Sequence, residues 1–409
     1  MTKVVVIGAG LSGLFSAILA AEKGADVTLL TRGRGGLELS HGCVDIWRDG
    51  ELHAGLDSLS PSHPYRKAGM DALEGAMRAF LRIVEPAGLG YIGDLHQSLK
   101  IPTAVGTFHL TNFAPRAQAP DEDIAETPTV IARIEGFRDV YPEMIRTNLE
   151  ARGVPVIGIV DLPLPGPPVR DVYASDLARL FDHPGDAARV CNAWEHSLGG
   201  VSARRLLLPA VLGFRKAGAV HRETEAVLGL PVQEFPTLPP SMPGLRLERA
   251  LWRAADEAGV HLVEGPMVHA LPAEAQRGAN VSALIAETAG GTRSFPADMV
   301  ILATGGVLNG GLQTARSGMV VESVFHIPIH GVDSRSTWTR GELLAAQPFE
   351  QFGLSVGPGF RPVDEDGEVL FDNVRAVGGI LAGADRISEG SRQGIDLASA
   401  YFAVEDGLG

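Results

Sequence analysis

The sequence predicts an α/β fold in which a Rossmann-type dinucleotide-binding domain is interrupted by an inserted second domain. Three segments carry this prediction: a glycine-rich turn between a strand and a helix at residues 4–23, a buried strand ending in small residues at 298–306, and a strand, glycines and a helix at 373–404. Parallel strands that alternate with helices are typical of nucleotide-binding folds. Because the three segments lie far apart in the chain, the domain that they form must be discontinuous.

The first segment has the pattern of a phosphate-binding loop. Val4 to Ile7 is predicted to be a strand, and the run Gly8-Ala9-Gly10-Leu11-Ser12-Gly13 follows it, ahead of a helical stretch from Leu14 to Lys23 and a second strand from Asp26 to Leu30. In such a loop the first glycine allows a tight turn, the second lets the backbone approach a phosphate, and the third lets the helix pack on the strand. We therefore expect these six loop residues to bind the phosphates of a nucleotide cofactor at the helix N-terminus.

The two later segments repeat the pattern of a buried strand that ends in small residues. At such glycines the backbone is expected to pass close to another group. The expected cofactor-binding residues of these segments are Thr304, Gly305, Gly306, Gly378, Gly379 and Gly394. A helical run from Ile395 to Val404 closes the third segment. This order of elements resembles the layout of flavoproteins of the glutathione-reductase and fumarate-reductase kind, whose last helix directs its N-terminus at the flavin ring.

The spacing of the segments sets the expected domain boundaries. Residues 1–60, 245–312 and 355–409 are expected to form the flavin-binding domain. Residues 61–244 and 313–354 are expected to form a cap that serves substrate or partner binding. Val130 to Ile134 and Arg205 to Leu208 are predicted to be strands of this cap.

Composition and charge narrow the range of functions. The formal net charge of -14 argues against binding to nucleic acid or to an anionic membrane surface. Two cysteines, Cys43 and Cys191, are too few for a disulfide framework or a set of iron–sulfur ligands, and no metal site is expected. The apolar runs are shorter than the ~18 residues of a membrane-spanning helix. The first strand begins so close to Met1 that no signal peptide is expected.

Several motifs outside the glycine loops are more distinctive. They are Thr31-Arg32-Gly33, Ser40 to Asp45, His63-Pro64-Tyr65, Pro236 to Ser241, Gly310-Gly311-Leu312, Phe352-Gly353-Leu354, Arg361-Pro362 and the stretch from Ala376 to Ala403. Through them the chain resembles, over nearly its whole length, the B subunit of the bacterial anaerobic glycerol-3-phosphate dehydrogenases, which are related to the fumarate reductase and succinate dehydrogenase flavoproteins.

The resemblance implies a function within a complex. Such a complex oxidises sn-glycerol 3-phosphate to dihydroxyacetone phosphate and passes electrons to quinone. It implies FMN in this subunit, a catalytic subunit with FAD, and an iron–sulfur subunit that attaches the complex to the membrane. This chain would then be cytoplasmic, associated with the inner face of the cell membrane through a partner.

The identity of the flavin stays open at this point. Many FAD enzymes place an acidic residue after the second strand to bind the adenosine ribose, whereas this chain has Thr31, Arg32 and Gly33 there. Near the C-terminus, Gly379 stands where an acidic residue often holds the ribityl chain. Both differences favour FMN or an unusual pose of FAD. The complete glycine loop favours FAD, because only FAD has a pyrophosphate.

The sequence gives weaker indications about the flavin ring and catalysis. Ser40, His41 and Gly42 fall where fumarate-reductase-like enzymes run along the flavin, so they are expected to bind it. His41 is expected to pack or to form hydrogen bonds rather than to bond covalently to flavin. Arg361, just ahead of the closing segment, and His41 are the weak candidates for catalytic residues, and no general base is assigned.

Two main functions therefore remain. In the first, the chain transfers electrons between a catalytic flavoprotein and an iron–sulfur subunit. In the second, it is a self-sufficient FAD-dependent oxidoreductase that acts on its own small substrate. A scaffold with a vestigial flavin site is a third interpretation.

Overall fold

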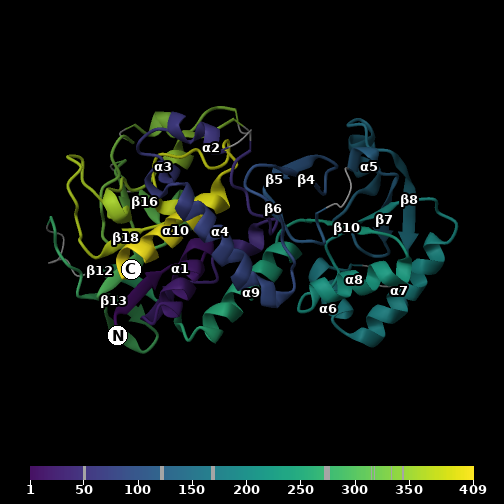
Figure 1. Cartoon of the computed structure of the whole chain (residues 1–409), viewed down its shortest axis with the longest axis horizontal. Coiled ribbons are helices and arrows are strands. Elements are labelled where there is room, and N and C mark those ends of the chain that lie inside the picture. The colour runs from purple at the N-terminus through teal and green to yellow at the C-terminus, as the bar shows by residue number, and fades with distance from the viewer. Residues whose placement is uncertain are drawn as a thin grey trace. The chain divides into compact units, whose positions relative to one another are not determined.

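A computed structural model describes residues 1–48, 52–119, 124–166, 171–270, 277–314, 316, 318–332, 334–342 and 345–409. The chain divides into two compact units. The first comprises Met1–Gly36, Asp45–Ile83 and Leu251–Gly409, and the second comprises Leu37–Val44 and Val84–Ala250. Both termini belong to the first unit (Figure 1).

The first unit is built on a five-stranded parallel sheet. In the order of the sheet, the strands are β11 (His261–Glu264), β2 (Asp26–Thr31), β1 (Lys3–Ile7), β15 (Met299–Leu302) and β18 (Val374–Ala376). All four pairings are parallel. The strands β1, β15 and β18 are almost wholly buried, and for β1 and β15 the continuous apolar runs in their sequences predict this. The strands expected near residues 4, 26, 298 and 373 are thus confirmed, and the sheet brings them together.

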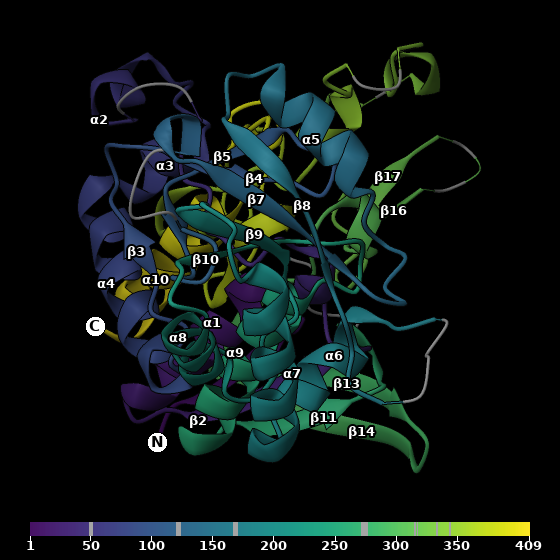
Figure 2. The same ribbon diagram turned by 90° about the vertical axis from the view of Figure 1, so that its right-hand side faces the viewer.

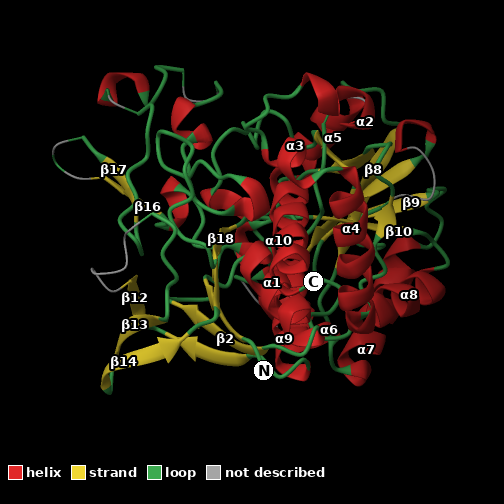
Figure 3. Cartoon of the chain, turned by 60° about the vertical axis from the view of Figure 1, so that its left-hand side comes forward, coloured by secondary structure: helices red, strands yellow, loops and turns green. Residues whose placement is uncertain are grey.

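Two long helices of the first unit pack side by side next to this sheet. Helix α1 (Leu11–Glu22) follows the glycine loop, and helix α10 (Arg392–Leu408) ends the chain (Figure 3). Residues 11–20 of α1 are all buried, which is why the helix is apolar on every side instead of amphipathic. The two helices are longer than the stretches from 14 to 23 and from 395 to 404 that the sequence predicted.

The first unit contains three further α-helices and two antiparallel sheets among the described residues. The helices are α2 (Leu52–Gly55), α3 (Pro64–Ala68) and α4 (Met70–Val84), whose last residue begins the second unit. An antiparallel sheet contains β12 (Met267–Ala270), β13 (Ala283–Thr288) and β14 (Gly291–Pro296) (Figure 3). A two-stranded sheet contains β16 (Leu312–Thr314) and β17 (Val320–Glu322).

The second unit has a parallel sheet of its own. Its four strands, in the order of the sheet, are β10 (Val232–Phe235), β9 (Arg205–Pro209), β7 (Thr129–Ile134) and β8 (Val156–Leu162). The sequence predicted β7 and β9 but neither β8 nor β10. Two small antiparallel pairs join β3 (Ile92–Gly93) with β6 (Phe113–Ala114) and β4 (Leu99–Pro102) with β5 (Phe108–Thr111).

Helices surround the sheet of the second unit. They are α5 (Pro142–Glu150), α6 (Ala174–Phe181), α7 (Pro184–Leu198) and α8 (Ala217–Leu228), and α7 and α8 are neighbours (Figure 2). Helix α9 (Met242–Glu257) contains the division between the two units. The core of the unit includes the fully buried side chains of Trp194, Phe181 and Phe235.

The division of the chain differs from the expected domain boundaries. Residues 61–83 and the described residues of 313–354 were expected in the cap, yet they belong to the first unit. The reason is tertiary contact. Helix α4 approaches α10 closely enough that a Cβ on Gly75 would lie 2.7 Å from the ring of Tyr401, and the amide of Leu354 donates to the carbonyl of Ile380. Conversely, residues 37–44 and 245–250 were expected in the flavin-binding domain, yet they belong to the second unit.

Candidate functional site

The carboxyl ends of four strands meet at one edge of the sheet in the first unit. The amide of Gly8 donates to the carbonyl of Leu30, and the amide of Ala303 donates to the carbonyl of Ile7. The amide of Val377 in turn donates to the carbonyl of Leu302 (3.0 Å). The segments after β2, β1, β15 and β18 are therefore held side by side. This is the edge where open α/β sheets bind their ligands.

The glycine loop after β1 has the three steric properties that its sequence predicts. Gly8 has a φ of +107°, and a Cβ there would lie 2.3 Å from the carbonyl oxygen of Ala303. A Cβ on Gly13 would lie 1.8 Å from the carbonyl oxygen of Gly8, so only glycine lets α1 pack against the turn. A Cβ on Gly10 would meet no protein atom within 4 Å. Gly10 thus borders open space at the N-cap of α1, as a loop that approaches a phosphate requires.

The turn after β18 packs directly on the glycine loop. A Cβ on Gly378 would lie 2.3 Å from the hydroxyl of Ser12 and 2.9 Å from a carboxylate oxygen of Asp396. The amide of Gly378 donates to the hydroxyl of Ser399 on α10 (2.9 Å). These contacts hold the first residues of α1, the turn after β18 and the N-terminal half of α10 together.

The turn after β15 contains a buried polar atom without a partner. Among the described residues, no group hydrogen-bonds to the buried Oγ1 of Thr304. A Cβ on Gly306 would approach the carbonyl oxygen of Gly379 to 3.0 Å, so the turns after β15 and β18 are also in contact. An unsatisfied buried hydroxyl is costly, and a polar ligand at this edge would satisfy it. Together with the open space at Gly10, this fits a nucleotide cofactor.

The residues after β2 are engaged mostly with one another. The hydroxyl of Thr31 donates to the carbonyl of Gly33, and the amide of Gly33 contacts the same hydroxyl (3.3 Å). Arg32 is exposed. A residue that the sequence analysis missed, Gly35, packs on the glycine loop, since a Cβ there would lie 2.6 Å from the carbonyl oxygen of Ala9.

An arginine occupies the space that the missing side chain of Gly379 leaves. A Cβ on Gly379 would lie 2.8 Å from an Nη of Arg386, whose other Nη donates to Asp396 (2.9 Å). Burial raises the pKa of Asp396, and the charges of Arg386 and Arg392 lower it in part. The sequence analysis missed this ion pair because its two residues carry no recognisable motif.

A hydrogen-bonded chain precedes the N-terminus of α10. Nδ1 of the buried His63 accepts from the amide of Tyr65 (3.1 Å), so the ring proton lies on Nε2, which donates to Glu389 (3.2 Å). The hydroxyl of Ser391 also donates to this carboxylate (2.8 Å). Burial acts to raise the pKa of Glu389, but the hydrogen bonds from His63 and Ser391 outweigh it, so the pKa is lowered.

The N-cap of α10 does not satisfy the first amides of the helix. The hydroxyl of Ser391, the N-cap residue, is turned to Glu389 and makes no cap hydrogen bond. The amide of Gly394 donates instead to the carbonyl of Asp45 (2.9 Å). The N-terminus of a helix favours negative charge nearby. Gly394, in the first turn, lets the helix approach Tyr65 closely, because a Cβ there would lie 2.0 Å from Oη.

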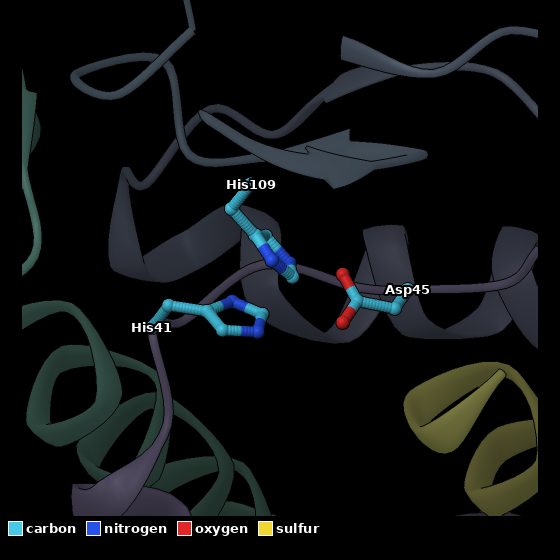
Figure 4. A group of neighbouring side chains, drawn as sticks. All are labelled: His41, Asp45 and His109. Atoms are coloured by element: carbon cyan, nitrogen blue, oxygen red, sulfur yellow. The ribbon is translucent and has the colours of Figure 1, made fainter. Parts of the chain in front are cut away.

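Ser40, His41 and Gly42 belong to the second unit and contact other residues of that unit. Nδ1 of His41 accepts from the amide of Cys43 (3.1 Å). The ring of His41 lies 4.2 Å from that of His109, between centroids (Figure 4). The hydroxyl of Ser40 donates to the carbonyl of Leu37, while the carbonyl of Gly42 accepts from the buried hydroxyl of Tyr91.

Arg361 lies away from the strand ends. Its Nε donates to the carbonyl of Pro358 (3.0 Å), and its guanidinium is 3.9 Å from Asp372. The neighbouring Phe360 packs on Phe402 in the C-terminal half of α10. Residue 402 is ten residues beyond the start of α10, a rise of about 15 Å. The structure thus does not bring Arg361 to the glycine loops.

Comparison with known proteins gives a consistent result. The model of a family described as an FAD binding domain matches residues 3–395. The B subunit of the probable anaerobic glycerol-3-phosphate dehydrogenase of Halobacterium salinarum is 31% identical to this chain over 419 residues, which cover 98% of this chain and 96% of that protein. The B subunit of the anaerobic glycerol-3-phosphate dehydrogenase of Yersinia pestis is 30% identical over 424 residues, with coverages of 98% and 97%.

Similarity to solved structures is more remote. The crystal structure of 3-ketosteroid delta1-dehydrogenase from Sterolibacterium denitrificans, in complex with 1,4-androstadiene-3,17-dione, is 11% identical with a TM-score of 0.45, and the match covers 100% of both chains. An open conformation of a flavocytochrome c3 fumarate reductase is 10% identical with a TM-score of 0.39, covering 100% of this chain and 78% of the other.

Proposed function

Because this chain belongs to the FAD binding domain family and to the family of B subunits of anaerobic glycerol-3-phosphate dehydrogenases, we propose that it is the FAD-carrying subunit of such a dehydrogenase. In this proposal the complex oxidises sn-glycerol 3-phosphate to dihydroxyacetone phosphate. The chain passes electrons from a catalytic flavoprotein subunit to an iron–sulfur subunit, and from there they reach quinone.

The observation that carries the proposal is the meeting of the glycine loop, the turns after β15 and β18, and the N-terminus of α10 at one edge of the sheet. Gly10 and the first amides of α1 would hold the pyrophosphate. The hydroxyl of Thr304 and the turn at Gly378 and Gly379 would lie along the cofactor. We propose Ser40, His41 and Gly42 as further contacts of the flavin ring.

Several features support FAD over FMN. The family model is that of an FAD binding domain, and the glycine loop retains every steric property that a pyrophosphate needs. The missing acidic residue after β2 removes one contact to the adenosine ribose but leaves the pyrophosphate contacts intact. FMN, which the resemblance implied, has no such support from the family model.

Bound FAD supplies the ability to accept two electrons and to release them one at a time. The residues of this chain orient it. The uncapped N-terminus of α10 favours negative charge on the cofactor. Arg386 and Asp396 form a largely buried ion pair beside Gly379, so they fix the shape of the site at that turn.

Electrons must leave this chain through a partner in this proposal. Its sequence contains two cysteines, Cys43 and Cys191, which cannot hold an iron–sulfur cluster. No helix in the described part of the chain is both long and apolar enough to cross a bilayer. We propose that the chain works in the cytoplasm, associated with the cell membrane through the iron–sulfur subunit.

The test begins with the purified chain. We expect a flavin absorbance spectrum, and we expect chromatography of the flavin released by acid to show FAD. A chain that purifies without flavin and takes up none from added FAD would contradict the proposal, whereas release of FMN would correct the cofactor alone. Co-expression with the neighbouring subunits should bring the chain to the membrane fraction.

A further inference from the structure

A small cavity lies wholly within the second unit. Its volume is about 270 Å³, just under the range of about 300–1,000 Å³ that is usual for drug-sized ligands. The walls come from residues 88–90, residues 115–117, helix α8 and the first half of α9. None of these elements belongs to the sheet that carries the glycine loop. The cavity therefore needs an explanation apart from flavin binding.

Among the charged side chains of the lining, arginines outnumber carboxylates. Arg116, Arg222 and Arg246 come from three different elements, and Glu225 is the carboxylate among the lining residues. Three arginines around a small cavity are unusual in a chain whose formal net charge is -14. Such a lining raises the local concentration of anions.

One of these arginines is held rigidly. Arg246 is buried, with 5% of its surface exposed. Its Nε donates to the carbonyl of Gly213 (2.8 Å), and both Nη atoms donate to the buried carboxylate of Glu234. Its charge is therefore compensated, and it gives the cavity a fixed wall with further N–H groups. Arg222 adds a positive charge that the carboxylate of Glu234 does not neutralise.

The single carboxylate is already engaged. Oε1 of Glu225 accepts from the amide of Val232 (2.9 Å), and Oε2 lies 3.6 Å from Nδ1 of the buried His221. Nε2 of His221 donates to the carbonyl of Val232 (2.7 Å). Glu225 thus ties α8 to β10. In the part of the chain that the structure describes, no carboxylate forms an ion pair with Arg222, which projects from the same helix.

The first turn of α8 forms part of the cavity wall. Ala217 and Gly218 line the cavity, and the N-cap residue, Lys216, makes no side-chain cap hydrogen bond. Gly218 sits against the carbonyl of Gly88, since a Cβ there would lie 1.8 Å from that oxygen. The turn can therefore form this wall only without a side chain. Just ahead of α8, the amides of residues 214–216 already donate to the carboxylate of Asp182, so α8 contributes one side of the helix to the cavity and not its N-terminal end.

We propose that this cavity is a binding site for a small phosphate-bearing anion. A tetrahedral phosphate offers acceptors in several directions, which suits guanidinium groups that come from three elements, whereas a planar carboxylate suits one bidentate arginine. The proposal goes beyond flavin binding and does not depend on it, because all of its residues lie in the second unit.

Calorimetric titration of the full chain tests the proposal. The probes are inorganic phosphate, sn-glycerol 3-phosphate, glycerol and acetate. We expect both phosphate compounds to bind, and glycerol and acetate to bind far more weakly. Tighter binding of glycerol 3-phosphate than of inorganic phosphate identifies a phosphorylated metabolite as the occupant, and equal binding identifies free phosphate.

Matched variants locate the site. Replacing the exposed Arg222 (R222Q) should weaken phosphate binding roughly tenfold, the usual loss for one charge-assisted hydrogen bond. The control is R249Q, because Arg249 lies on α9 three residues after Arg246, contacts the ring of Phe214 and does not line the cavity. The control should bind phosphate like the unmodified chain, and both variants should unfold at the temperature of the parent.

Three results would overturn the proposal. They are no binding of either phosphate compound at millimolar concentration, acetate binding as tight as phosphate binding, or an equal loss in R222Q and R249Q. The last result would show attraction by the general field of the unit rather than by this cavity. Loss of flavin from the chain would leave the phosphate titration unchanged, so the two proposals fail separately.

Discussion

The hydroxyl of Tyr65 occupies the space where a side chain on Gly394 would have to lie, because a Cβ there would be 2.0 Å from Oη. Tyr65 is fully buried and donates to the carbonyl of Ile46 (2.9 Å), and burial raises its pKa well above 10.0. The phenol is therefore a fixed, neutral wall against the first turn of α10. The contact between these two residues, which are 329 positions apart in the sequence, limits how closely the N-terminus of α10 can pack against α3.

Replacing Gly394 with alanine (G394A) should lower the free energy of unfolding by roughly 1–3 kcal/mol, as overpacking of a filled core does. Denaturant unfolding measures the change. The control is G185A in the first turn of α7, where a Cβ meets nothing within 4 Å. Removing the hydroxyl as well, in Y65F with G394A, should restore part of the loss. Equal stability of G394A and the parent chain would contradict the close contact.

Replacing Gly10 with valine (G10V) should abolish flavin binding. Gly10 has a φ of -74° and a Cβ there meets no protein atom, so valine disturbs only the space that we assign to a phosphate. The ratio of flavin to protein absorbance measures occupancy. The control is G158V in strand β8, where a Cβ also meets nothing. Full flavin occupancy in G10V would move the phosphate site elsewhere.

The bound flavin should leave the protein intact on acid denaturation. Nδ1 of His41 is engaged by the amide of Cys43, and Cys43 itself is buried, with 1% of its surface exposed. Neither residue is arranged as a reactive nucleophile in the second unit. After precipitation the yellow colour should remain in the supernatant. Mass spectrometry that found a flavin adduct on His41 or Cys43 would refute this expectation.

The stability of the chain should fall as the pH rises past the ordinary range of a glutamate. Glu322 is buried and accepts the amides of Val324 and Phe325 (2.7 Å each). Burial raises its pKa from 4.5 to about 7, although these hydrogen bonds lower it in part. A carboxyl group whose pKa is raised in the folded state stabilises the fold fully at pH values below its unfolded-state pKa. This stabilisation is lost as the pH rises through the folded-state pKa.

We therefore expect the ionisation of Glu322 to lower the free energy of unfolding by up to about 3 kcal/mol between pH 4.5 and 7. Unfolding of the parent chain and of E322Q across this range measures the difference, which should narrow at low pH and widen toward pH 7. The control is E287Q, because Glu287 is an exposed carboxylate on β13 of the same unit. A difference between E322Q and the parent that does not change with pH would contradict the raised pKa.

The isolated chain should not oxidise sn-glycerol 3-phosphate with a dye as electron acceptor. Arg361, one of the two weak candidates for catalysis, contacts Pro358 and Asp372 and lies beside the C-terminal half of α10. The turns after β1, β15 and β18, at residues 8–13, 304–306 and 378–379, contain no histidine, aspartate or glutamate that could act as a general base. Adding the catalytic subunit should start turnover. Robust turnover by the isolated chain would favour the self-sufficient oxidoreductase.

The sequence alone predicted those elements that depend only on residues close together in the chain. Gly8 and Gly13 could be assigned from spacing alone, because a missing side chain in a strand-to-helix turn has the same steric effect wherever the turn occurs. Buried parallel strands could be predicted at β1 and β15, because they are continuously apolar.

How these elements combine could be seen only in the folded chain. Glu389 meets His63 across 326 positions of sequence, and Arg386 fills the place beside Gly379, because the parallel order of the sheet brings the ends of distant strands and helices together. The same holds for Arg222 and Arg246, which reach one cavity from two helices. Periodicity along a chain reports which face of an element is buried, but it does not report which other element covers that face.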